Sequence, residues 1–328
     1  MRTNKALIMR VVQSTFVTRE ACRRTAHVGY ARRARPHDDC TLRNSRVLHV
    51  NMCFTTAASA AKLDNTTRPI TICIEGNISA GKSTFLQEVL KFSDHHMRGN
   101  VCLVPEPVHL WQSVERASDR TSTINVLDEF YKDPSGLAYK FQHYVFMTRF
   151  IEETRSRQGN FDLRVMERSV FSDKNVFTAA LYENGWLSDL DLSLYHAWYS
   201  PMLKEFPSLT PDGFVYLRAS PTTCLRRLKK RARGEETGVD ATYLTSLHSK
   251  HESWLLPEDA VTVIQRSLAT VNEVKMDCGG NMKTVPVLVL NCDDDTDMAT
   301  DVAIKKKLHD AIVAFYTYLQ HRNMCDTL

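Results

Sequence analysis

One short stretch of the sequence combines glycines, a lysine and a hydroxyl side chain at a spacing suited to binding phosphate. Residues 76–83 read GNISAGKS, which fits the pattern GxxxxGK[ST]. Glycines let the backbone curl so that successive N–H groups face phosphate oxygens, the lysine reaches the β- and γ-phosphates, and the serine hydroxyl suits Mg²⁺. The residues predicted to bind a nucleotide here are Gly76, Asn77, Ile78, Ser79, Ala80, Gly81, Lys82, Ser83 and Thr84.

Charged side chains follow two apolar runs further along the chain. Glu106 comes two residues after the run 101–104, and Glu167 and Arg168 directly follow the run 163–166. Such groups suit phosphoryl transfer, in which a base, a metal ion and a cation each take part. A solvated loop acid and an ordinary ion pair are the alternative interpretations.

The elements that must position these residues alternate along the chain. An apolar run precedes the glycine-rich stretch and an amphipathic pattern follows it, as a phosphate-binding loop requires. Continuous apolar runs are typical of parallel strands covered on both faces. The predicted strands are 70–74, 101–104, 163–166, 214–217 and 285–290, and the clearest helices are 135–157 and 300–322.

This alternation predicts an α/β fold with a five-stranded parallel sheet flanked by helices, in one domain of about residues 69–322. In such sheets ligands bind beyond the carboxyl ends of the strands, where Glu106 and Glu167 are expected. The segment 276–283 contains a Gly pair and is predicted to be a turn or loop.

The net charge of +4 is unevenly spread over the 328 residues. Residues 1–68 hold thirteen Lys and Arg against four acids, so the remainder is mildly acidic, and we predict no stable nucleic-acid binding by the folded domain. The composition of 1–68 favours a mitochondrial import signal. A disordered basic tail, in a protein of the cytosol or nucleus, is the alternative. No apolar run reaches the ~18–20 residues of a membrane span.

Several further segments occur in a specific order. They are PEPVHLW at 105–111, EFYKDPSGLAYKFQHYVFMTR at 129–149, MERSVFSDKNVF at 166–177, RRLKKRARGEETG at 226–238 and YLTSLHSKHESWL at 243–255. Together with the glycine-rich stretch they resemble the deoxyribonucleoside kinases, the group that contains deoxycytidine, deoxyguanosine and mitochondrial thymidine kinases. The resemblance covers 69–256 closely and 285–322 loosely, and leaves out 1–68 and 268–284.

The resemblance implies a P-loop kinase fold and transfer of phosphate from ATP to the 5′-hydroxyl of a deoxyribonucleoside. It places Glu106 as the catalytic base, Arg168 beside the reacting phosphoryl group, and Ser83 and Glu167 at Mg²⁺. It also implies an arginine-rich lid at about 226–238, whose Arg227, Arg231 and Arg233 close over the phosphates. Asp295 aligns only roughly with a region that contacts adenine.

The resemblance also implies which residues line the nucleoside pocket. Gln142 contacts the base, Tyr131 and Glu236 hold the sugar 3′-hydroxyl, and aromatic side chains enclose the site. Arg149 and Asp173 occupy positions that carry Arg and Asp in the deoxycytidine and deoxyguanosine branch. The full set is Glu106, Trp111, Tyr131, Phe141, Gln142, Arg149, Arg168, Asp173, Phe177 and Glu236.

We therefore expect deoxycytidine or purine deoxynucleosides as substrates, with a thymidine-preferring or broadly specific kinase as the alternative. A thymidylate-type kinase would usually carry Asp-Arg where this chain has Glu167 and Arg168. A P-loop NTPase acting as a switch or binding module would leave the later motifs unexplained. The family is usually dimeric, and the apolar helical patterns at 135–157 and 187–206 could pair in a homodimer.

Overall fold

The computed structural model describes residues 68–90, 100–265, 269–293 and 298–325. These residues lie in one compact unit, Thr67–Leu328. The predicted leader therefore lies outside the described residues, except for Arg68. No helix among the described residues is long and apolar enough to cross a membrane.

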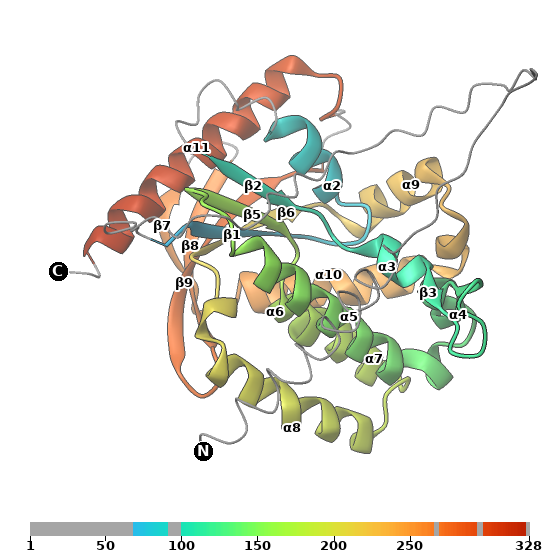
Figure 1. Cartoon of the computed structure of the whole chain (residues 1–328). Helices are drawn as coiled ribbons and strands as arrows, with labels where there is room; N and C mark the ends of the chain where they lie inside the picture. Colours follow the sequence, from blue (N-terminus) through green and yellow to red (C-terminus); the bar gives the residue numbers. More distant parts are fainter. Residues whose placement is uncertain (1–67, 91–99, 266–268, 294–297, 326–328) are drawn as a thin grey trace, which may run out of the picture. The chain divides into compact units, whose positions relative to one another are not determined.

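Each predicted strand is present in a central sheet, and all five run parallel (Figure 1). Their order across the sheet is β2, β5, β1, β6, β9, so strands distant in the sequence are neighbours. The bounds are β1 Ile70–Glu75, β2 Val101–Val104, β5 Leu163–Glu167, β6 Gly213–Arg218 and β9 Met282–Asn291.

The prediction of five strands is too low, because two antiparallel strands extend the sheet beyond β9. They are β8, Ala269–Asp277, and β7, Val261–Gln265, which forms the edge. Exposed and buried residues are mixed along β8, so this region lacks the continuous apolar run by which the other strands were predicted. The predicted loop at 276–283 is a tighter hairpin turn, in which Gly279 and Gly280 adopt φ of 78° and 90°.

Helices cover both faces of the sheet (Figure 1). Ile72 and Ile74 of β1 belong to a core shared with α11, Val302–Cys325. Cys73, which points to the opposite face, belongs to a core shared with α5, Pro134–Ser156, and α8, Asp189–Glu205. This alternation follows from the two-residue period of a strand, and burial on both faces explains why β1 is apolar throughout.

Shorter helices surround the carboxyl ends of β1, β2 and β5. The helix predicted after the glycine-rich stretch begins as α2, Lys82–Thr84, and continues as the π-helical segment η1, Phe85–Val89. The others are α3 Val108–Gln112, α4 Val126–Lys132, α6 Val170–Ser172, η3 Asp173–Thr178, α7 Ala179–Glu183, α9 Pro221–Arg231, η5 Gly234–Gly238 and α10 Ala241–Leu255. The short helix η4, Pro207–Leu209, precedes β6 at the opposite end of the strands. A small ribbon of β3, Val114–Glu115, and β4, Thr123–Ile124, joins α3 to α4.

Candidate active site

A cavity of about 920 Å³ opens where β1, β2 and β5 end. Most of the residues predicted for the site line this cavity. They are Ile78, Ser79, Gly81, Lys82, Ser83, Thr84, Glu106, Trp111, Tyr131, Phe141, Gln142, Arg149, Glu167, Arg168, Asp173, Phe177, Arg227, Arg231, Arg233 and Glu236. Gly76, Asn77 and Ala80 belong to the loop behind the cavity lining, and Asp295 lies outside the described residues.

The glycine-rich loop adopts a conformation that only small residues permit at two points. Gly76 has φ of 147°, and a Cβ atom there would lie 2.7 Å from the Leu217 carbonyl oxygen. Gly81 has φ of 103° at the start of α2. Asn77 anchors the loop, because its Nδ2 donates to the Leu244 carbonyl at 2.8 Å. The loop is therefore shaped before any ligand binds.

Lys82 lies folded back against this loop. Its Nζ donates to the carbonyl oxygens of Asn77 at 2.7 Å and Gly76 at 3.2 Å. Burial lowers the pKa of Lys82 to about 8, since the protein environment disfavours an isolated ammonium. The two carbonyl groups stabilise the positive charge of Lys82 only in part. A bound polyphosphate would supply the full negative charge that this ammonium lacks.

Ser83 and Glu167 meet at the floor of the cavity. The Ser83 hydroxyl donates to Glu167 Oε1 at 2.8 Å, although 84 residues separate them in the sequence. A carboxylate and a hydroxyl beside a phosphate loop are oxygen donors of the kind that Mg²⁺ prefers. The donor set therefore fits Mg²⁺.

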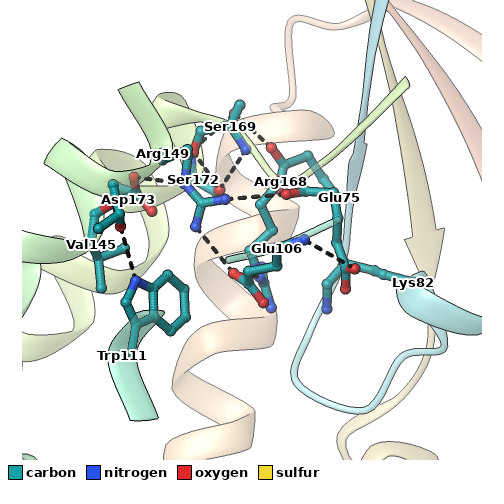
Figure 2. Close-up of polar contacts among 12 residues, drawn as sticks. Glu75, Lys82, Glu106, Trp111, Val145, Arg149, Arg168, Ser169, Ser172 and Asp173 are labelled. Carbon is teal, nitrogen blue, oxygen red and sulfur yellow. Dashed lines mark hydrogen bonds and ion pairs between the residues drawn. The ribbon is translucent and has the colours of Figure 1, made fainter. Parts of the chain in front are cut away.

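Glu106 is held between two arginines (Figure 2). Its Oε1 lies 3.1 Å from Arg149 Nη2 and 3.3 Å from Arg168 Nε. Burial alone would raise the pKa of Glu106, but Arg168, Arg149 and Lys82 together hold it below its usual value. Glu106 is therefore a carboxylate at neutral pH and can accept a proton.

Arg149 also binds Asp173, so the two acids share one guanidinium (Figure 2). Its Nε donates to Asp173 Oδ2 at 2.9 Å, and its Nη1 donates to the Glu167 carbonyl at 3.1 Å. Arg149 and Asp173 are 2% and 0% exposed, and Asp173 Oδ1 has no hydrogen-bond partner among the described residues. The pair thus presents one buried acceptor at the cavity wall.

Gln142 presents a second unmatched group on the same helix, α5. It is buried, and its Oε1 has no hydrogen-bond partner among the described residues. Phe141 beside it stacks on Phe130 with ring centroids 4.6 Å apart and meets Trp111 edge-on at 5.9 Å. An apolar slot with a free amide oxygen suits a flat heterocycle that carries hydrogen-bond donors.

Glu236 binds two arginines of the segment predicted to be a lid. The Glu236 carboxylate accepts from Arg231 and, at 3.3 Å, from Arg233. Arg227 lies further back, where its guanidinium donates to the Ala80 carbonyl at 3.3 Å and the Cys292 carbonyl at 2.9 Å. The predicted sugar-binding acid and two of the three predicted phosphate-binding arginines, Arg231 and Arg233, therefore belong to one cluster.

Sequence reasoning missed several residues of the site. Leu127 and Phe130 line the cavity, and their spacing on one face of an amphipathic helix was the available signal. Tyr243 and Lys230 also line it. Glu75 is a charged residue at the end of an otherwise apolar strand, directly before the glycine-rich loop. This contrast between the acid and its apolar strand is the sequence signal for Glu75.

Comparisons with known proteins agree with this geometry. Residues 72–316 match the family model described as deoxynucleoside kinase. Deoxycytidine kinase 2 of Gallus gallus is 33% identical over 260 residues, which cover 75% of this chain and 90% of the relative. Deoxycytidine kinase of Bos taurus is 34% identical over 266 residues, covering 76% and 93%. Mitochondrial deoxyguanosine kinase of Xenopus laevis is 33% identical over 257 residues, covering 74% and 88%.

The family match extends over most of the chain and includes every cavity-lining residue from Ile78 to Met298. The relatives are similar over most of their own length as well as most of this chain. The chain therefore belongs to the deoxynucleoside kinase family of ATP-dependent phosphotransferases.

Proposed function

We propose that the protein phosphorylates deoxycytidine or purine deoxynucleosides, and uses thymidine poorly. The observation that carries the proposal is the buried ion pair of Arg149 and Asp173 at the cavity wall. The unmatched Asp173 Oδ1 is an acceptor for the exocyclic amino group of a base, and the pair fills space that a thymine methyl would need. The similarity to deoxycytidine and deoxyguanosine kinases supports the same branch.

In the proposed reaction the nucleoside lies between α3, α4 and α5 with its 5′-hydroxyl toward Glu106. Glu106 accepts the hydroxyl proton as the oxygen attacks the terminal phosphorus of ATP, and ADP leaves. Lys82, Arg168 and the arginines of the lid, 226–238, offset the charge that develops on the phosphoryl oxygens. Ser83 and Glu167 would hold Mg²⁺, which neutralises charge on the ATP phosphates.

Tyr131 and Glu236 would hold the sugar 3′-hydroxyl, and Gln142 would contact the base edge. Trp111, Phe141 and Phe177 would enclose the base. Binding by Glu236 requires its carboxylate to divide its contacts between the sugar and the lid arginines Arg231 and Arg233. This arrangement would link occupation of the nucleoside site to the position of the lid.

The test is initial rates of ADP formation with deoxycytidine, deoxyadenosine, deoxyguanosine and thymidine. We expect kcat/KM for thymidine to be at least about 10²-fold below the best substrate, since losing a buried polar match costs a few kcal/mol. The double change Arg149→Met with Asp173→Ala should shift preference toward thymidine. A single change would instead leave one charge buried without its partner.

Two outcomes would contradict different parts of the proposal. If the unaltered protein takes thymidine best, the interpretation of the base pocket is wrong, while the kinase activity stands. If ADP forms at the same rate without any nucleoside, the protein acts as a hydrolase under the assay conditions and the substrate proposal fails altogether.

We also propose that the protein is a homodimer paired through α8. Leu190 and Leu194 lie one helical turn apart on α8 and are 68% and 45% exposed. Two such faces packed together would bury apolar side chains that otherwise contact water. Sedimentation velocity should give a dimer, and Leu190→Glu with Leu194→Glu should give a monomer. A monomer before mutation would contradict the proposal.

A further inference from the structure

Glu75 is a buried carboxyl group that the proposed reaction does not use. It ends β1, is 0% exposed, and its Oε1 accepts a hydrogen bond from the Ser169 hydroxyl at 2.6 Å. Its Oε2 has no hydrogen-bond partner among the described residues. Burying a carboxyl with an unmatched oxygen costs free energy, so its presence beside the site calls for a specific role.

Ser169 connects Glu75 to the start of α6. Its Oγ accepts hydrogen bonds from the backbone N–H groups of Phe171 at 3.2 Å and Ser172 at 3.3 Å, and so caps α6. The Ser169 hydroxyl donates its hydrogen bond to Glu75 (Figure 2). Its hydrogen therefore points away from those N–H groups, and the oxygen lone pairs stay directed at them. Glu75 therefore fixes the rotamer of a helix cap.

The residue directly before this cap is Arg168, whose backbone is strained. Its φ of 66° lies in the left-handed region, which is unfavourable for a residue with a side chain. The Arg168 N–H donates to the Ile74 carbonyl at 2.9 Å, so Arg168 is held on one side by β1 and on the other by the Glu75–Ser169 bond.

This strained backbone aims the Arg168 side chain into the cavity. Its guanidinium contacts Glu106 at 3.3 Å and lies 4.7 Å from the centre of the Phe177 ring. Its Nη1 is buried and has no hydrogen-bond partner among the described residues. This guanidinium lies beside Glu106, the predicted catalytic base. Its unmatched N–H group would donate a hydrogen bond to an oxygen of the transferred phosphoryl group.

We infer that Glu75 is a positioning residue, which acts through Ser169 to hold Arg168 in the conformation that the reaction requires. The same bond fixes the start of α6, whereas Asp173 further along is held by its own contact with Arg149. The inference rests on the proposed role of Arg168 at the reacting phosphoryl group. It assigns Glu75 no contact with either substrate.

The kinetic test compares Glu75→Ala, Glu75→Gln and Ser169→Ala. Glu75→Ala should lower kcat at least about tenfold and leave KM for the nucleoside within about twofold. The reason is that Arg168 acts on the phosphoryl group being transferred rather than on the nucleobase. Glu75→Gln keeps an oxygen acceptor for Ser169 and should retain kcat within about threefold. The double variant Glu75→Ala with Ser169→Ala should have a kcat no lower than that of the poorer single variant, since both changes break the same Glu75–Ser169 hydrogen bond.

A matched control separates positioning from lost stability. Glu153 is also a buried acid, paired with Arg157 and Arg164, and does not line the cavity. Glu153→Gln should lower Tm without changing kcat of the folded protein. The inference is overturned if Glu75→Gln loses as much kcat as Glu75→Ala, or if the Glu75 and Ser169 changes multiply as independent effects.

A structural readout keeps the test valid if the proposed function fails. In a crystal structure of Glu75→Ala, Arg168 is expected to leave the left-handed region and to lose its contact with Glu106. If Arg168 keeps both its φ and that contact, Glu75 does not position it, whatever the enzyme phosphorylates. Absence of nucleoside-dependent turnover in the unaltered protein would instead reject the proposed function alone.

Discussion

At the scale of single residues, Glu106 combines position and charge in the way that a base requires. Its carboxylate contacts two guanidinium groups, and these keep its pKa below the usual value. A base with a low pKa accepts a proton weakly, so its effect depends on how far phosphoryl transfer has acidified the hydroxyl when the proton moves.

We predict that Glu106→Gln folds normally and lowers kcat by ~10²–10⁴-fold, the usual contribution of a positioned general base. The amide keeps the size of the side chain and can still accept from Arg149 and Arg168. Circular dichroism should therefore match the unaltered protein. Near-normal turnover in this variant would show that proton removal by Glu106 does not limit the reaction.

Glu75 gives a second prediction at this scale, concerning stability against pH. Burial raises the pKa of Glu75 from 4.5 to about 7 in the folded protein. Between these two values the folded state binds more protons than the unfolded state, so this group's contribution to stability falls as pH rises. It is fully present below about pH 4.5 and is lost as pH passes about 7.

Glu75→Gln removes this dependence, because an amide does not ionise. Relative to the unaltered protein, the variant should gain up to about 3 kcal/mol in free energy of unfolding between pH 4.5 and pH 8. Urea unfolding at several pH values measures the difference. Two stability curves that run parallel across this range would mean that Glu75 ionises in the folded protein as it does in water.

At the scale of elements, the hydrogen bonds of Glu235 connect the predicted lid, 226–238, to two helices beside the cavity, α3 and α4. Its Oε1 accepts from Gln112 Nε2 of α3 at 2.8 Å and from Asn125 Nδ2, at the start of α4, at 3.0 Å. The next residue, Glu236, binds Arg231 and Arg233 of the predicted lid. The loop η5 is thus fixed between both halves of the site.

We predict that Gln112→Glu raises KM for the nucleoside about three- to tenfold, because it replaces a donor by a second carboxylate facing Glu235. Adding Glu235→Gln should restore KM, since the introduced amide can donate to the introduced carboxylate. Glu235→Gln alone keeps the Oε1 acceptor and should change little. Gln158→Glu, an exposed change outside the cavity, controls for added charge. Failure of the double change to restore KM would count against this connection.

The sequence patterns were sufficient for elements whose environment is uniform. Strands buried on both faces are continuously apolar, and all five were predicted within a few residues. Two strands were missed: β8, which mixes exposed and buried positions, and the edge strand β7, whose residues 261–263 are exposed. Contacts such as Ser169 with Glu75 and Gln112 with Glu235 join residues 94 and 123 apart, so no local pattern could indicate them.

At the scale of the whole molecule, charge separates the leader from the catalytic unit. Residues 1–68 hold thirteen Lys and Arg against four acids, whereas the rest is mildly acidic, and residues 1–67 lie outside the described residues. Among the described residues, those that line the active-site cavity all lie between Ile78 and Met298. We propose that the leader directs import into mitochondria and takes no part in catalysis.

A chain beginning at Thr67 should therefore keep kcat and KM within about twofold of the full chain, since it retains every described residue that lines the cavity. Starting there retains Arg68, whose guanidinium contacts Asp212 at 2.6 Å beside β6, so the first strand keeps its anchor.

In cells, the full chain with a C-terminal fluorescent protein should enter mitochondria and the shortened chain should remain outside. Fusion of residues 1–68 alone to the same reporter should suffice for import, which tests the leader apart from the enzyme. Loss of activity in the shortened chain without a change of location would show that the leader serves the catalytic unit rather than an import pathway.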